Sequence, residues 1–122
     1  MNTSPKKLLF ALRHAPYGNR FAKEALDAVL ATAVYEQELS VVFMDDGVFQ
    51  LINTQQADAI NEKSFSNMLS AFPLYDIDRV FACQQSLLDR GISNQSIPTM
   101  IQRLNKQDIS TLFRQQDHLL SF

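Results

Sequence analysis

The chain has 122 residues, of which 46% are hydrophobic and 20% charged, and its 11 basic and 13 acidic side chains give a net charge of −2. This length predicts one domain with one core, and the charge excludes a strongly basic nucleic-acid binder. The single cysteine excludes a disulfide framework and a cysteine-rich metal site within one chain. We find no apolar run of membrane-spanning length and no secretory signal, so we expect a cytoplasmic protein without membrane association.

The first part of the chain predicts a strand, a helix and a second strand. Residues 8–12 are an apolar run without alternation, which is typical of a strand buried on both faces. Residues 13–18 indicate a loop, and small apolar residues then recur at helical spacing over about 19–36. Residues 39–44 form the second buried run. Since a helix connects the two strands, we expect them to pair in parallel.

The middle of the chain is less regular. The Asp-Asp-Gly motif at 45–47 ends the second strand. Residues 48–52 fit either another strand or a helical turn, and we favour the turn because Asp46 can cap it. The polar stretch 53–63 is expected to be a mobile excursion. Residues 64–72 place apolar side chains at helical spacing, which predicts an amphipathic helix that starts at a capping serine and ends before a proline.

The last part continues the alternation of strands and helices. A third buried strand over 79–83 leads into a short helix over 86–90 that Gly91 ends. The remaining predicted elements are a fourth strand, a helix and a last strand, over 98–101, 108–116 and 118–122. This alternation predicts an α/β fold of three layers, α/β/α, around a mainly parallel sheet of about five strands. The strand order stays open.

The loop after the first strand is a candidate contact for an anion or a partner. The carboxyl ends of strands and the N-termini of helices favour negative groups. The loop lacks the glycine motifs of dinucleotide and phosphate-loop sites, so we expect no nucleotide there. The alternative is a solvated loop with surface cations. The candidate contact residues are Arg13, His14, Gly18, Asn19 and Arg20.

Asp45 and Asp46 raise the question of a magnesium site, because paired carboxylates hold this ion in phosphoryl-transfer sites. Neighbouring side chains of an extended segment point to opposite faces. We therefore favour one helix cap and one solvated carboxylate. His14 and His118 have no carboxylate at metal-ligand spacing, and we expect neither a metal nor another cofactor.

Cys83 is the one residue with intrinsic nucleophilic reactivity. It ends the third predicted strand and precedes a helix, where the helix dipole and free N–H groups stabilise a thiolate. The alternative is a buried cysteine that acts as a small hydrophobic side chain. Exposure decides between the two.

Several large apolar side chains fall outside the predicted strands. Apolar patches left on a surface mark interfaces, and aromatic residues are enriched there. The alternative is that these segments fold back as core beneath the loops. We expect residues 46–52 and 70–76 to contribute to subunit interfaces and the isolated chain to self-associate. The candidate interface residues are Phe49, Leu51, Phe72, Leu74 and Tyr75.

Five segments together carry a family resemblance. They are Ala15-Pro16-Tyr17-Gly18, Glu24-Ala25-Leu26-Asp27-Ala28, Phe43-Met44-Asp45-Asp46-Gly47-Val48-Phe49-Gln50-Leu51, Leu74-Tyr75-Asp76-Ile77 and Cys83-Gln84-Gln85-Ser86-Leu87-Leu88-Asp89-Arg90-Gly91. From its first strand to its last, the chain resembles the DsrE/DsrF family, and within it the branch of TusC (DsrF-like) subunits of the sulfur relay.

The resemblance implies a single DsrE/F-like domain over 1–122, in a cytoplasmic hexamer with two copies each of TusB-like, TusC-like and TusD-like subunits. Such a complex passes persulfide sulfur from TusA to TusE for 2-thiolation of the tRNA wobble uridine, so tRNA is a partner only indirectly. In the family, the sulfur-carrying cysteine belongs to the TusD subunit. Cys83 stands at the corresponding place, but Gln84 and Gln85 follow it instead of an alanine-rich run.

The leading hypothesis is therefore an accessory subunit of the sulfur relay that carries no catalytic residue. Two alternative functions also involve sulfur chemistry. One is a stand-alone persulfide sulfurtransferase that uses Cys83, and the other is a DsrF-type subunit in dissimilatory sulfur oxidation. A third alternative is a binder of a small molecule or anion at the loop around Gly18.

Overall fold

The structure is a computed structural model, and it describes residues 6–15, 21–33, 38–52, 72–93, 97 and 101–122. Within these residues the chain forms five strands: β1 (Lys7–Leu12), β2 (Glu38–Phe43), β3 (Arg79–Cys83), β4 (Gln102–Leu104) and β5 (His118–Ser121). The helices are α1 (Phe21–Thr32), α3 (Gln84–Asp89) and α4 (Lys106–Arg114), with two 3₁₀ helices, η1 (Asp45–Leu51) and η2 (Phe72–Tyr75). The predicted three-layer α/β/α fold with a parallel five-stranded sheet is confirmed.

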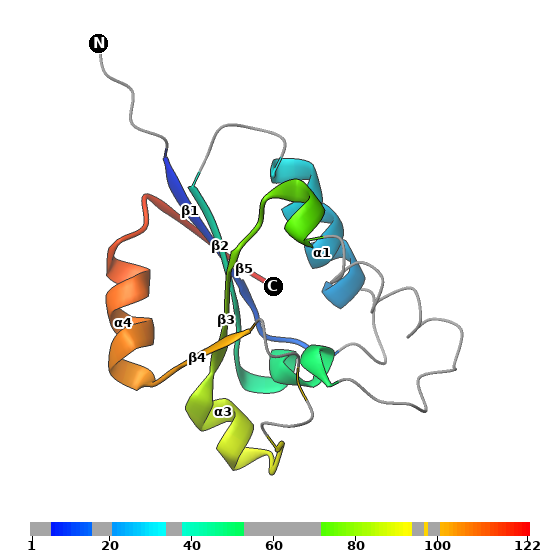
Figure 1. The fold of residues 1–122 in the computed structure, drawn as a ribbon, viewed down its shortest axis with the longest axis vertical. Coiled ribbons are helices and arrows are strands. Elements are labelled where there is room, and N and C mark those ends of the chain that lie inside the picture. Colours follow the sequence, from blue (N-terminus) through cyan, green and yellow to red (C-terminus); the bar gives the residue numbers. More distant parts are fainter. Residues whose placement is uncertain (1–5, 16–20, 34–37, 53–71, 94–96, 98–100) are drawn as a thin grey trace.

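The order of the strands places the helices on two faces of the sheet. The order is β4-β3-β2-β1-β5, so the chain steps in one direction from β1 to β4 and then returns past β1 to form β5. Right-handed crossovers in opposite directions put their helices on opposite faces. Figure 1 shows this arrangement, with α1 on one side of the sheet and α4 on the other.

Each face of the sheet has its own apolar core. Alternate residues of the strands point to opposite faces, and the central strands are buried from end to end apart from their first residues. The α1 face includes Phe10, Val41, Val80 and Val29. The smaller core on the α4 face comprises Leu9, Ala11, Val42, Phe81, Cys83, Leu104, Ile109 and Leu112.

Most of the predicted strands and helices agree with the structure within a few residues. The predicted fourth strand is the exception. It was expected over 98–101, but β4 starts at Gln102, which pairs with Phe81. Ile101 lies in a bend and is buried in the core of the α1 face, so its apolar side chain reflects packing beside the sheet instead of strand pairing. Residues 98–100 lie outside the described part of the chain.

Other predictions fall wholly or partly on residues that the structure does not describe. They are the excursion over 53–63, the helix over 64–72 except for its last residue, and both ends of the helix expected over 19–36. Phe72 itself is the first residue of η2.

Candidate functional site

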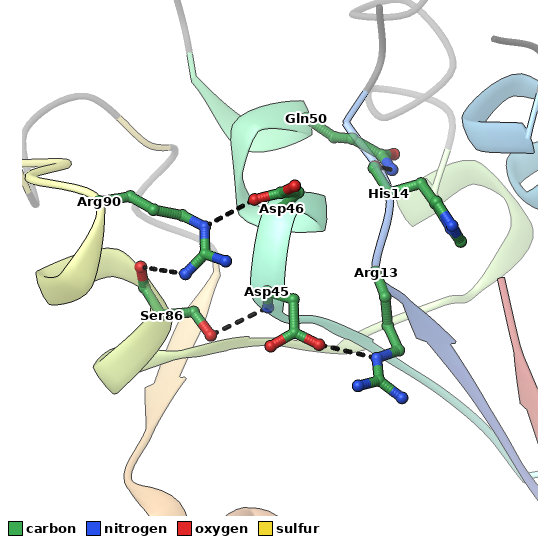
Figure 2. Close-up of polar contacts among 7 residues, drawn as sticks. All are labelled: Arg13, His14, Asp45, Asp46, Gln50, Ser86 and Arg90. Carbon is green, nitrogen blue, oxygen red and sulfur yellow. Dashed lines mark hydrogen bonds and ion pairs between the residues drawn. The ribbon is translucent and has the colours of Figure 1, made fainter.

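The carboxyl ends of β1, β2 and β3 hold several of the residues that the sequence singled out for chemistry. β1 leads into Arg13 and His14, β2 leads into η1, and β3 ends at Cys83, where α3 begins. Figure 2 shows Arg13 turned toward Asp45 and Arg90 toward Asp46. The Gln50 side chain points toward the backbone of His14, whose ring is turned away from the two carboxylates. We call this group, Arg13, His14, Asp45, Asp46, Gln50, Ser86 and Arg90, the carboxyl-end cluster.

A glycine allows η1 to lie directly against the end of β1. The N–H of Met44 donates to the carbonyl oxygen of Leu12 over 3.0 Å, and the N–H of Gly47 donates to the carbonyl of Met44 over 2.8 Å. A Cβ on Gly47 would overlap the carbonyl group of Leu12, far inside contact distance. The Asp-Asp-Gly motif therefore combines two carboxylates with the close backbone approach that sets their position.

Both carboxylates of the motif form ion pairs with arginines from other segments. Arg13 Nε lies 2.7 Å from Asp45 Oδ2, and Arg90 Nε lies 3.0 Å from Asp46 Oδ1. The expected helix cap at Asp46 is wrong, because η1 starts one residue before it and Met44 is the N-cap residue, without a side-chain bond. The expected solvated carboxylate agrees with the structure, because the Asp46 side chain is 61% exposed, and its guanidinium partner Arg90 was not expected.

Ser86 fixes α3 to the start of η1. Its buried Oγ accepts a hydrogen bond from the N–H of Asp45 over 2.9 Å. Asp45 has a φ of 51°, in the left-handed region that aspartate tolerates better than most residues. At the C-cap of α3, Arg90 Nη1 donates to the carbonyl oxygen of Ser86 over 3.3 Å. Two contacts thus hold α3 against η1. Ser86 and Asp45 are 41 positions apart in the sequence, and Arg90 and Asp46 are 44 positions apart.

Gln50 connects η1 back to the segment after β1. Its buried side chain donates from Nε2 to the carbonyl oxygen of His14 over 2.6 Å. The other end of this amide, Oε1, is also buried and has no hydrogen-bond partner among the residues that the structure describes. The carboxyl-end cluster is therefore a structural connection among β1, η1 and α3, and its arginines are already paired with carboxylates.

Cys83 is buried although it stands where the sequence placed a reactive thiol. It ends β3 and occupies the N-cap position of α3, without a side-chain bond to the helix. Only 6% of the residue is exposed, and its side chain belongs to the core of the α4 face, with Leu104 and Ile109. A thiol in apolar surroundings is the setting of a structural cysteine.

The predicted anion or partner contact is only partly described. Arg13 and His14 are exposed at the carboxyl end of the sheet, but the guanidinium of Arg13 is paired with Asp45. Gly18, Asn19 and Arg20 lie outside the described residues. Across the described ranges, no three His, Cys, Asp or Glu side chains gather into a metal site, and no described helix is long and apolar enough to cross a membrane.

The predicted interface residues separate into core and surface. Leu51 and Phe72 are fully buried within the chain, so the premise that they are left on the surface is wrong. Leu74 is 84% exposed and Tyr75 is 42% exposed, and Phe49 is partly buried. Since η1 follows the carboxyl end of β2 and η2 precedes the amino end of β3, the two predicted patches lie at opposite ends of the parallel sheet.

Sequence reasoning did not find Gln50, Ser86 and Arg90. A buried glutamine and a buried serine look like surface residues in a sequence, because burial of a polar side chain depends on a partner from elsewhere in the chain. For Arg90, the only local signal was its place at the end of a short helix. Its ion pair with Asp46 spans 44 positions and needs the fold to become visible.

Known proteins are similar to this chain over nearly its whole length. Residues 6–122 match the model of the DsrE/DsrF-like family. The chain is 36% identical over 116 residues to a protein named TusC homolog from Vibrio parahaemolyticus, which covers 95% of this chain and 98% of that protein. A TusC homolog from Aliivibrio fischeri is 28% identical over the same shares of the two chains. The crystal structure of the YchN protein from E. coli has the same fold, with a TM-score of 0.79 at 21% identity, over 96% of this chain and 99% of that one.

Proposed function

Because this chain belongs to the DsrE/DsrF-like family, we propose that it is an accessory subunit of a cytoplasmic sulfur-relay complex. In this role it contributes no sulfur-carrying thiol. The complex passes persulfide sulfur from TusA toward TusE for the 2-thiolation of the tRNA wobble uridine. Its direct partners are TusB-like and TusD-like paralogous subunits, in a dimer of heterotrimers.

One observation carries this proposal. The chain matches proteins named TusC homolog at 36% identity, and the match leaves out little of either chain. A match of this extent includes loops and helix ends in addition to the core that defines the fold. It therefore supports a role as the corresponding subunit.

The burial of Cys83 supports the accessory role over that of a carrier. In persulfide transfer, the thiolate of the acceptor attacks the outer sulfur of the donor's persulfide, the S–S bond breaks, and the donor leaves as a thiolate. The acceptor sulfur must be open to a second protein. Cys83 is 6% exposed and belongs to an apolar core, so a partner cannot approach it without a local opening of the α4 face.

Co-expression with the two paralogues tests the subunit role. A tagged form of this chain, produced together with a TusB-like and a TusD-like protein, is expected to retain both partners through affinity purification and size exclusion. Native mass spectrometry should then find two copies of each subunit. A chain that elutes alone, with both partners soluble in the same lysate, contradicts the proposal.

The pathway is tested separately from the assembly. Cells that lack this chain are expected to lose the 2-thio group of the wobble uridine, which mass spectrometry of digested tRNA measures directly. Unchanged thiolation together with impaired oxidation of reduced sulfur would assign the complex to dissimilatory sulfur oxidation instead.

A further inference from the structure

The edge strand β5 is exposed along its whole length. It pairs in parallel with β1 on one side and forms the end of the sheet on the other. All four of its residues are exposed, with Leu119 at 48% and Leu120 at 39%. In the register with β1, Leu119 lies beside Leu9 on the α4 face and Leu120 lies beside Phe10 on the α1 face. An apolar side chain is therefore open on each face of this edge.

The outer side of β5 presents backbone groups that have no backbone partner among the described residues. Phe122 donates its N–H to Ala11 and accepts at its carbonyl oxygen from Arg13, so its backbone groups point toward β1. Backbone groups alternate in direction along a strand, so the N–H and C=O groups of Leu119 and Ser121 point away from the sheet. None of these four groups has a backbone partner within the described part of the chain.

The opposite edge of the sheet has protection that β5 lacks. β4 has Arg103 at its centre. Charged side chains are one of the features by which proteins protect an edge strand from pairing. β5 has no lysine, arginine, proline or bulge, and its centre consists of two leucines. The two edges of one sheet thus differ in the way expected if β5 pairs with another strand.

We propose that β5 pairs in antiparallel orientation with β5 of a second copy of this chain, about a two-fold axis that passes beside Leu120. In this register Leu119 lies opposite Ser121 of the other copy, and the reverse pair follows by symmetry. Each of these pairs exchanges two N–H···O bonds. All four outward groups of each copy are satisfied, and the two sheets become one continuous sheet of ten strands.

The second copy is the occupant because the strand is complementary to itself. A two-fold axis normal to the sheet keeps each face of the sheet on its own side, so Leu120 meets Leu120 of the other copy on the α1 face. A symmetric contact of this kind is closed and leaves no free edge at β5 for a third copy. Four residues per copy make a small interface, so we expect a concentration-dependent dimer.

Cysteine cross-linking tests the register. The Cα atoms of residue 120 in the two copies should lie about 4.5 Å apart, as in a non-hydrogen-bonded antiparallel pair, which a disulfide bridges. The Cα atoms of residue 119 should be about 8 Å apart, beyond the reach of a disulfide. Under oxidised glutathione, Leu120→Cys is expected to give a covalent dimer, and Leu119→Cys, its matched control, is expected to give none. Equal cross-linking of both, cross-linking of Leu119→Cys alone, or none in either overturns the proposal.

Removal of one outward N–H tests the hydrogen bonds. The N–H of Ser121 has no backbone partner in the described part of the chain, so Ser121→Pro should fold as the wild type does. It should nevertheless weaken the dimer about tenfold or more. Ser121→Ala retains the N–H and is expected to dimerise normally. Sedimentation velocity from about 10 µM to about 500 µM should show the wild type rising from 13.9 kDa toward twice that mass.

A folded Ser121→Pro variant that dimerises like the wild type contradicts the proposal, and so does a wild-type chain that stays monomeric throughout. If the proline variant does not fold, the cysteine pair decides. These measurements use the chain alone. Their failure leaves the proposed subunit role standing, and failure of the co-expression experiment leaves this dimer standing.

Discussion

Cys83 illustrates how a residue's place in the chain and its surroundings can point to different roles. Its position between β3 and α3 is that of a reactive thiol, and its side chain packs in an apolar core. The direction of the Cys83 side chain decides between these two roles. Residues alternate along β3, so Cys83 points to the α4 face, away from the core that holds Leu87 of α3.

We expect the thiol of Cys83 to be shielded in the native chain. A thiol reagent such as DTNB should react at least about tenfold more slowly with the folded protein than with the unfolded protein, because reaction needs exposure. Cys83→Ala should lower the free energy of unfolding by about 1–2 kcal/mol, as is usual for the loss of a small buried group. Fast, stoichiometric labelling of the native chain would contradict the burial.

The two glycines in the described part of the chain, Gly47 and Gly91, should respond differently to replacement by alanine. A Cβ at position 47 would overlap the backbone of Leu12, which cannot move without disturbing β1. Gly47→Ala should therefore cost about 3 kcal/mol or more. Gly91 has a φ of 66° and open space around it, so Gly91→Ala should cost only about 1 kcal/mol. Urea denaturation of both variants measures the difference, and similar values would contradict the close approach.

At the scale of elements, helix ends are held by different means. α4 has a side-chain cap, in which Asn105 Oδ1 accepts from the N–H of Asp108 over 2.8 Å. α3 has none at its start and is held instead by Ser86 and Arg90, which contact η1. The first kind of support depends on residues three positions apart, and the second depends on the complete sheet.

Replacement of the α4 cap should have a moderate and specific effect. Asn105→Ala removes the acceptor for a helix N–H and is expected to lower the free energy of unfolding by about 1 kcal/mol. Asn105→Asp retains an acceptor oxygen at the same place and serves as the control, with little loss. Chemical denaturation followed by circular dichroism checks both. A loss in the aspartate variant equal to that of the alanine variant would show that the cap bond contributes nothing.

The sequence predicted those elements whose signal is local. β1, β2 and β3 are continuous apolar runs because both of their faces are buried, and such runs are visible without any partner. β4 was not predicted at its observed position, because its residues Gln102, Arg103 and Leu104 form an edge strand that is only partly buried. The buried apolar residue before it, Ile101, led to a predicted strand over 98–101 instead. The carboxyl-end cluster was only partly predictable for the same reason. Its Asp-Asp-Gly motif is local, whereas Ser86 and Arg90 reach it from a helix more than 40 positions away.

At the scale of the whole molecule, burial separates residues that support the fold from residues free to meet a partner. Leu74 and Tyr75 leave large apolar surfaces exposed on η2, at the amino end of the sheet. Phe72, two positions earlier, is part of the core. The interface expected from the sequence over 70–76 therefore reduces, among the residues described, to the outer side of η2.

A charge on the outer side of η2 should affect assembly and leave the fold intact. Leu74→Asp is expected to lower the retention of TusB-like and TusD-like partners at least about tenfold, because a carboxylate cannot be buried there unpaired. The circular dichroism spectrum should be unchanged. Phe72→Asp is the contrasting variant and should unfold the chain. Full retention of both partners by Leu74→Asp would show that the outer side of η2 is not part of the interface.

The central claim is that the chain is needed in the relay although its own thiol is not. The most direct measurement follows radiolabelled persulfide sulfur from a TusA-like donor to a TusE-like acceptor through the reconstituted complex, prepared with the wild-type chain, with Cys83→Ala, or without the chain. We predict near wild-type transfer with Cys83→Ala and loss of transfer without the chain. Loss of transfer in an intact Cys83→Ala complex would make the buried thiol a carrier, and undiminished transfer without the chain would remove it from the relay.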